Sequence, residues 1–175
     1  MKINTVLKSL LVVITLMLGI TANANIIEDP NGLLNINYTK PTDMTLCGSP
    51  SAYKVEIINI SSEKITGLEI ALRLPKGISY VSLADDLAGN FINYTGGQNP
   101  SFLLDQELMA DDEVELIFYA QSSCETNELL DAETGVVDFR DKILITYNVG
   151  GSMNTIDDKG DSYNVTFSEP VPSIP

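Results

Sequence analysis

The chain has no histidine and no tryptophan among its 175 residues, and only two of its residues are cysteines. Without histidine, a serine or cysteine nucleophile lacks its usual imidazole base, and the commonest metal ligand is missing. The absence of tryptophan removes the ring that could serve as a platform for a sugar. No glycine-rich phosphate loop is present either. These absences predict a protein that is not an enzyme. Paired carboxylates of a glycosidase are the weaker alternative, because 24 acidic residues place some pairs side by side by chance.

Basic residues are scarce. Ten lysines and arginines stand against 24 aspartates and glutamates. A surface with this balance repels phosphate backbones and anionic lipid headgroups, which argues against nucleic acid and anionic membranes as partners. The acidic residues are spread along the chain, a pattern that is typical of a solvated surface.

The one long apolar run lies at the amino terminus. A lysine-containing start without acids leads into an apolar stretch over residues 10–20, and Ala22 and Ala24 then occupy the positions that signal peptidase reads. The stretch is too short for a spanning helix, which needs about 20 apolar residues. The pattern predicts a Sec-type signal peptide over residues 1–24 and a mature chain that begins at Asn25. We therefore expect a secreted or bacterial cell-surface location without an integral membrane segment after cleavage. An uncleaved anchor is the alternative.

Cleavage would leave 151 of the 175 residues, which suits one domain with its own core. Two lysines lie in the leader, so eight basic residues would remain against 24 acidic ones, a net charge of −16. Cys47 and Cys124 are the only thiols of a chain expected to enter an oxidising compartment, where paired cysteines form disulfides. We predict a Cys47–Cys124 disulfide that stabilises the fold by about 4 kcal/mol.

Short alternating runs of apolar and polar residues fill the mature chain. In residues 68–74 every even position is a large apolar residue, and Glu69 and Arg73 face the other way, which is the period of a half-buried strand. Pro75-Lys76-Gly77 then ends the strand, because proline cannot donate to a ladder. Seven to nine short strands separated by turns predict an all-β antiparallel sandwich. The expected strands are Leu33–Tyr38, Tyr53–Ile57 with a continuation to Ile60 past a bulge, Leu68–Leu74, Ile78–Val81, Phe91–Tyr94, Phe102–Leu104, Val114–Ala120, Ile143–Tyr147 and Tyr163–Phe167.

Other segments are expected to be irregular. Leu108–Glu113 and Glu125–Glu133 are predicted to form single helical turns, and Gly150–Gly160 a loop rich in glycine and aspartate. The sandwich domain is expected to cover residues 25–168. Three prolines in Glu169–Pro175 predict a stiff linker or tail outside the core.

Several segments together resemble a known family. Val55–Asn59, Gly67–Leu74 and the Leu-Pro-x-Gly turn that continues through Val81 are similar to the conserved repeat domain of large bacterial surface proteins. Cys47-Gly48 and Ser123-Cys124 resemble the amino-terminal domains of giant secreted proteins of gliding Bacteroidota. The resemblance covers roughly Thr45–Val149. It implies an immunoglobulin-like sandwich, a cell-surface location and an adhesive or spacer role without catalytic residues. The long Asp111–Arg140 region and the lack of a carboxy-terminal sorting domain depart from it.

Two functions from different classes follow. The first is a non-catalytic surface module, adhesive or spacer, that forms the amino-terminal part of a longer chain with covalent neighbours. The proline-rich segment 169–175 has the composition of a linker, and the family's domains occur in tandem. The second is a stand-alone secreted protein that binds calcium or a glycan. A surface glycan or a protein is the expected partner in either case.

Acid clusters in the expected loops are the candidate calcium ligands, because Ca²⁺ prefers hard oxygen donors. Asp157, Asp158 and Asp161 form the best cluster, with Gly160 for a tight turn, although Lys159 lies within it. A solvated acidic loop is the alternative, and no other cofactor is expected. The two further clusters are Asp85-Asp86 and Asp111-Asp112-Glu113.

Tyrosines are the remaining candidates for binding. Those that point outward from a strand could contact a glycan or a protein partner, whereas the alternative places them in the core or at sheet edges. The six tyrosines in or beside expected strands are Tyr38, Tyr80, Tyr94, Tyr119, Tyr147 and Tyr163.

Overall fold

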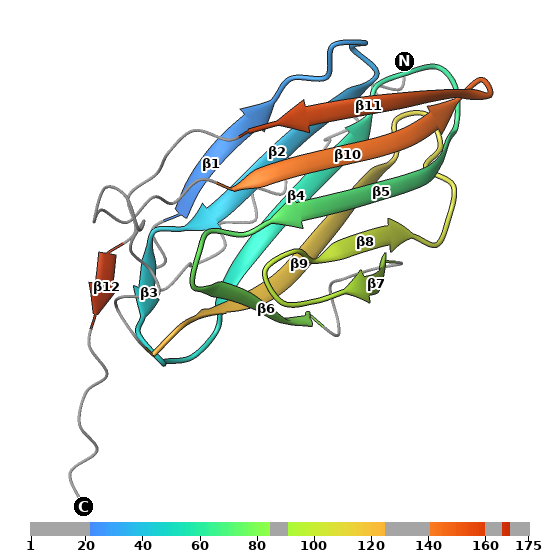
Figure 1. Ribbon diagram of the computed structural model, residues 1–175. Helices are drawn as coiled ribbons and strands as arrows, with labels where there is room; N and C mark the ends of the chain where they lie inside the picture. The colour runs from blue at the N-terminus through green and yellow to red at the C-terminus, as the bar shows by residue number, and fades with distance from the viewer. Residues whose placement is uncertain (1–21, 85–90, 125–140, 160–165, 169–175) are drawn as a thin grey trace, which may run out of the picture.

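A computed structural model describes residues 22–84, 91–124, 141–159 and 166–168. These residues form two five-stranded antiparallel sheets that pack face to face (Figure 1). The predicted all-β, immunoglobulin-like antiparallel sandwich is therefore confirmed. The first sheet has the order β1 (Ala22–Ile27), β2 (Leu34–Pro41), β4 (Ser51–Asn59), β9 (Glu113–Ser122) and β6 (Ile78–Leu83). The second has the order β11 (Ser152–Asp158), β10 (Lys142–Val149), β5 (Ile65–Arg73), β8 (Ser101–Leu104) and β7 (Phe91–Thr95). A short parallel pair joins β3 (Asp43–Thr45) to β12 (Thr166–Ser168).

The core lies between the inner faces of the two sheets. Because successive side chains of a strand point to opposite faces, every second residue points into the core. On β9, Leu116, Phe118 and Ala120 are fully buried in this way. Phe118 stacks on Tyr53 of β4 with 5.0 Å between ring centroids and lies 5.3 Å from Phe102 of the opposite sheet. Each such buried ring or aliphatic chain stabilises the fold by about 1.5–3 kcal/mol.

One predicted loop is in fact a strand. Residues 152–158, expected within a loop from 150 to 160, form edge strand β11 and pair with β10. Gly150 and Gly151 make the hairpin turn, with φ angles of 56° and 80° that glycine adopts at little cost. Ile156 is the only buried side chain on β11, so the strand does not show the alternation of apolar and polar residues that marks a half-buried strand. An edge strand that faces solvent gives little hydrophobic signal, and this explains the error.

Two smaller predictions are also wrong. Strand β4 runs without a bulge to Asn59 and stops there, so Ile60 lies outside it. The region from Leu108 to Glu113 is not a helical turn. Leu108 bridges Ile65 through two backbone hydrogen bonds of 2.9 Å, and the turn that the Asp112 amide closes on the Met109 carbonyl contains the left-handed Asp111, with a φ of 64°. The predicted turn at Glu125–Glu133, the start of the strand predicted at Tyr163–Phe167 and the tail at 169–175 lie outside the described residues.

Strand β1 overlaps the predicted cleavage site. Its six residues pair with residues 36–41 of β2, and Ala24 lies opposite Thr39. Cleavage after Ala24 would remove half of the strand. Within the part of the chain that the structure describes, no helix is long and apolar enough to cross a membrane.

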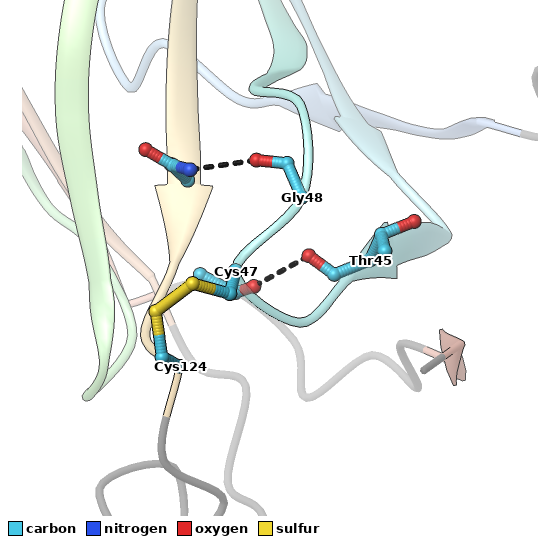
Figure 2. Close-up of a disulfide and its surroundings, with 6 residues drawn as sticks. Thr45, Cys47, Gly48 and Cys124 are labelled. Carbon is cyan, nitrogen blue, oxygen red and sulfur yellow. Dashed lines mark hydrogen bonds between the residues drawn. A yellow bond between two sulfur atoms is a disulfide. The ribbon is translucent and has the colours of Figure 1, made fainter. Parts of the chain in front are cut away.

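The first and last described strands reach the same end of the sandwich (Figure 1). Ala22 lies opposite Pro41 at the end of β2, and Phe167 of β12 lies opposite Met44 just beyond it. The predicted disulfide is present beside them, with Cys47 and Cys124 in one covalent link (Figure 2). We call this the disulfide end.

Hydrogen bonds around the disulfide tie β9 to the end of β3 and to the segment that follows it (Figure 2). The Gln121 side chain donates to the Gly48 carbonyl at 2.6 Å, and the Ser122 hydroxyl donates to the Thr45 carbonyl at 2.9 Å. The disulfide therefore reinforces a contact that the polar groups already make.

Candidate functional site

Four loops meet at the end of the sandwich opposite the disulfide (Figure 1, upper right). They join β1 to β2 (residues 28–33), β4 to β5 (residues 60–64), β8 to β9 (residues 105–112) and β10 to β11 (residues 150–151). We call this surface the distal end. The contacts within and between these loops make it the best ordered candidate for contact with another molecule.

Asn59 fixes two of the distal loops. Its side chain is fully buried at the end of β4, and its amide nitrogen lies within hydrogen-bond distance of three carbonyls. Its side-chain oxygen accepts from the Ser61 amide at 3.0 Å and from the Ser61 hydroxyl at 2.7 Å. A buried amide that is satisfied on both sides rigidifies its surroundings. The three carbonyls are those of Glu63 (2.8 Å), Leu108 (3.0 Å) and Met109 (3.0 Å).

Asp29 fixes the loop between β1 and β2. Its carboxylate accepts the backbone amides of Asn31, Leu33 and Leu34 at 2.9–3.0 Å. It also accepts the Tyr147 hydroxyl at 2.8 Å, which ties this loop to β10. Burial raises the pKa of Asp29, but the hydrogen bonds outweigh burial and hold the pKa below its usual value. Burial and the neighbouring Asp29 charge raise the pKa of Tyr147 well above its usual value.

The surface of the distal end combines apolar side chains with acids. Ile60 and Met109 are 54% and 51% exposed, and both adjoin the Asn59 anchor through the backbone. Lys64 is the one basic residue in the four loops, and its amine lies 2.7 Å from Glu107. The surrounding exposed acids include Glu63, Asp105, Asp111 and Asp112.

The outer face of the first sheet carries a second polar cluster. Lys54 on β4 pairs with Glu56 at 2.8 Å and with Glu115 on β9. Burial lowers the pKa of Lys54, but the two carboxylates outweigh burial and raise the pKa above its usual value. An open hollow of about 470 Å³ lies on the same face, lined by Ile26, Ile58 and four other residues beside Glu56. Because these charges already pair with one another, this face offers less to a charged ligand than the distal end.

The predicted calcium ligands do not lie in one loop. Asp157 and Asp158 are on strand β11, and Asp161 lies outside the described residues. The Asp157 carboxylate is 3.0 Å from the Lys142 amine on β10. Asp85 and Asp86 also lie outside the described residues. Among the residues that the structure describes, no three acids, cysteines or histidines gather as a metal site would require.

The acid cluster at residues 111–113 forms the turn into β9. Asp111 has a φ of 64°, a left-handed conformation that aspartate tolerates better than most residues. The Asp112 carboxylate accepts the Met109 amide at 3.1 Å. These contacts assign two of the three acids to turn formation.

The tyrosines do not form one outward patch among the described residues. Tyr38 and Tyr147 are buried, and Tyr80 packs edge-on against Phe102 with 5.7 Å between centroids. Burial raises the pKa of Tyr80. Tyr119 is half-buried on β9, Tyr94 on edge strand β7 is 59% exposed, and Tyr163 lies outside the described residues.

Neither Asn59 nor Asp29 was predicted as a site residue. The sequence does contain a signal for each: Asn59 interrupts an apolar run at the end of a strand, and Asp29-Pro30-Asn31-Gly32 is turn chemistry. Neither signal shows which loops meet, because that depends on the order of strands in the two sheets.

No family model and no curated protein matches the chain. Solved structures with a similar fold include the GAE domain of yeast GGA1, at 16% identity and a TM-score of 0.44, over 83% of this chain and 100% of that one. The GAE domain of GGA2p from Saccharomyces cerevisiae has 14% identity and a TM-score of 0.42, over 83% and 97%. The seventh ScaB type I cohesin from Pseudobacteroides cellulosolvens has 14% identity and a TM-score of 0.38, over 75% and 90%.

Proposed function

We propose that the chain is a non-catalytic cell-surface module, the amino-terminal unit of a longer protein, that contacts a protein partner through its distal end. The observation that carries the proposal is the position of the first and last described strands. Strands β1 and β12 both reach the disulfide end, and the four ordered loops lie at the opposite end. A chain that continues past β12 would leave from the disulfide end and present the distal end to the surroundings.

The chemistry of the distal end favours a protein partner with basic side chains. Ile60 and Met109 supply exposed apolar area, and the neighbouring acids would meet lysine or arginine across the interface. The loops are ordered by Asn59 and Asp29 before any contact, which lowers the entropy lost on binding. No exposed aromatic ring lies in the four loops, so the distal end lacks the flat apolar platform expected of a glycan site.

The size and location of the native protein test the modular part of the proposal. An antibody raised against the purified chain should detect, in the native host, a species much larger than 19.0 kDa. Protease added to intact cells should remove that species. A secreted species of about the calculated mass of the chain would contradict the proposal and leave the stand-alone binding protein.

Photo-crosslinking tests the contact surface. A photoreactive residue placed at position 60 or 109 should give discrete protein adducts on intact native cells. The matched control is position 81, because Val81 is 45% exposed on edge strand β6, away from the four loops. Adducts at position 81 with none at 60 or 109 would move the contact away from the distal end. Adducts that contain carbohydrate and no protein would show that the partner is a glycan and not a protein.

A further inference from the structure

A lysine and an aspartate are buried together between the two sheets. Lys40 lies on the inner side of β2 and Asp141 directly precedes β10, and each side chain is 1% exposed. The Lys40 Nζ lies 3.4 Å from the Asp141 Oδ1. Lysine and aspartate are almost never this deeply buried unless they are paired. The pair brings together positions 101 residues apart in the sequence.

Tyr38 holds the other carboxylate oxygen. Its hydroxyl donates to the Asp141 Oδ2 at 2.6 Å, and the Lys40 Nζ lies 5.0 Å from the centre of its ring. One carboxyl oxygen thus faces an amine and the other a phenol. Burial disfavours both charges of the pair, and an amide in their place would carry neither charge. Attack by the amine requires that it first give up one proton, which the adjacent carboxylate can accept.

We propose that Lys40 and Asp141 condense to an intramolecular isopeptide bond. The Lys40 Nζ attacks the Asp141 Cγ and forms the new C–N bond, and the Cγ–Oδ1 bond breaks. Of the three protons on the ammonium, two leave with Oδ1 as one molecule of water, and one stays on the amide nitrogen. The Oδ2 oxygen carries the negative charge of the tetrahedral intermediate and becomes the amide carbonyl. The reaction needs no oxidant, reductant or cofactor.

The fold supplies what the reaction requires. Two side chains fixed on packed strands react as one molecule, and the gain from such positioning can reach about 7–11 kcal/mol of the barrier. The Tyr38 hydroxyl is placed to stabilise the charge that develops on Oδ2, as an oxyanion-hole donor does. The bond would link β2 of the first sheet to the start of β10 in the second. The inference stands independently of the proposed function.

The intact mass of the full chain tests the proposal. Wild-type protein that has been purified, reduced and denatured should weigh one water molecule less than its sequence requires. Tandem mass spectrometry should place that loss on a branched peptide containing Lys40 and Asp141. A mass that matches the unmodified sequence would overturn the proposal and leave a buried ion pair.

Three variants distinguish the isopeptide bond from other reactions that remove one water molecule. Lys40→Arg should restore the full mass. A mass deficit that persists in this variant would indicate a succinimide at an aspartate and would refute the proposal. Asp141→Asn should lose ammonia instead of water and reach the same final mass as the wild type, since the amide product is identical. Tyr38→Phe should slow the appearance of the deficit after refolding, and an unchanged rate would remove Tyr38 from the reaction.

Discussion

At the scale of single residues, Asn59 is the best test of the distal end. Asn59→Ala removes the buried amide that bonds to three carbonyls and to Ser61. We expect the free energy of unfolding to fall by about 2–4 kcal/mol, because buried polar groups lose their partners. Urea unfolding followed by circular dichroism measures the change.

Asn154→Ala is the matched control for Asn59. The Asn154 side chain donates to the Ser152 carbonyl at 3.1 Å in an exposed position on β11. Its replacement should change the unfolding free energy by less than about 0.5 kcal/mol. Equal losses of unfolding free energy in the two variants would show that the Asn59 hydrogen bonds contribute no more than those of a surface amide.

The acid dependence of stability should include a contribution from Asp29. A carboxyl group whose pKa is lower in the folded state stabilises the fold above its unfolded pKa of about 3.9, and this is lost as pH falls through the folded pKa. We therefore expect Asp29→Asn to be less stable than the wild type at neutral pH, with a gap that narrows in acid. Thermal melts at a series of pH values measure the gap. A gap that does not change with pH would contradict the assignment.

Residue identity alone could not reveal the buried pair. In the sequence, Lys40 lies two residues beyond the strand predicted at Leu33–Tyr38 and Asp141 two residues before the strand predicted at Ile143–Tyr147, and neither position indicates the other. Their meeting depends on how β2 and β10 pack across the sandwich. The cysteines were easier to pair because a chain with two thiols allows only one disulfide.

At the scale of elements, the disulfide gives a direct prediction. Reduction of Cys47–Cys124 should lower the melting temperature, by an amount that corresponds to up to about 4 kcal/mol of unfolded-state entropy. The β-rich circular dichroism should persist at low temperature, because Gln121 and Ser122 still hold β9 to the neighbouring segment. Alkylation with mass measurement should find no free thiol before reduction. Two alkylated cysteines in the unreduced native protein would rule the bond out.

Strands were predictable where one face is apolar. Strands β4, β9 and β10, and β5 from Leu68 onward, alternate cleanly because their inner residues form the core. Strand β11 was missed because a solvent-facing edge strand needs few apolar residues. Strand β3 is only three residues long and has no periodicity to detect. Strand β1 was hidden because its first half lies in the predicted signal peptide.

At the scale of the whole molecule, the effect of calcium on the melting temperature distinguishes the surface module from the calcium-binding protein. We expect millimolar Ca²⁺ added to chelated protein to leave the melting temperature unchanged, because Asp157 is paired with Lys142 on a strand. A rise of several degrees would instead support a calcium site that includes Asp161, since a ligand that binds only the folded state stabilises it. Asp157→Asn should then abolish the rise. Mg²⁺ at the same concentration controls for ionic strength and divalent charge.

Strand β1 also sets an order of events in time. A segment within the cleft of signal peptidase must be extended and unpaired, yet Ala22, Asn23 and Ala24 pair with β2 in this fold. Cleavage after Ala24 and completion of this ladder therefore exclude each other in any one molecule. If the chain is cleaved after Ala24 as the sequence predicts, a precursor that folded first would hide its own cleavage site, so cleavage would have to precede the pairing of β1 with β2. Slow pairing of this edge would then favour cleavage.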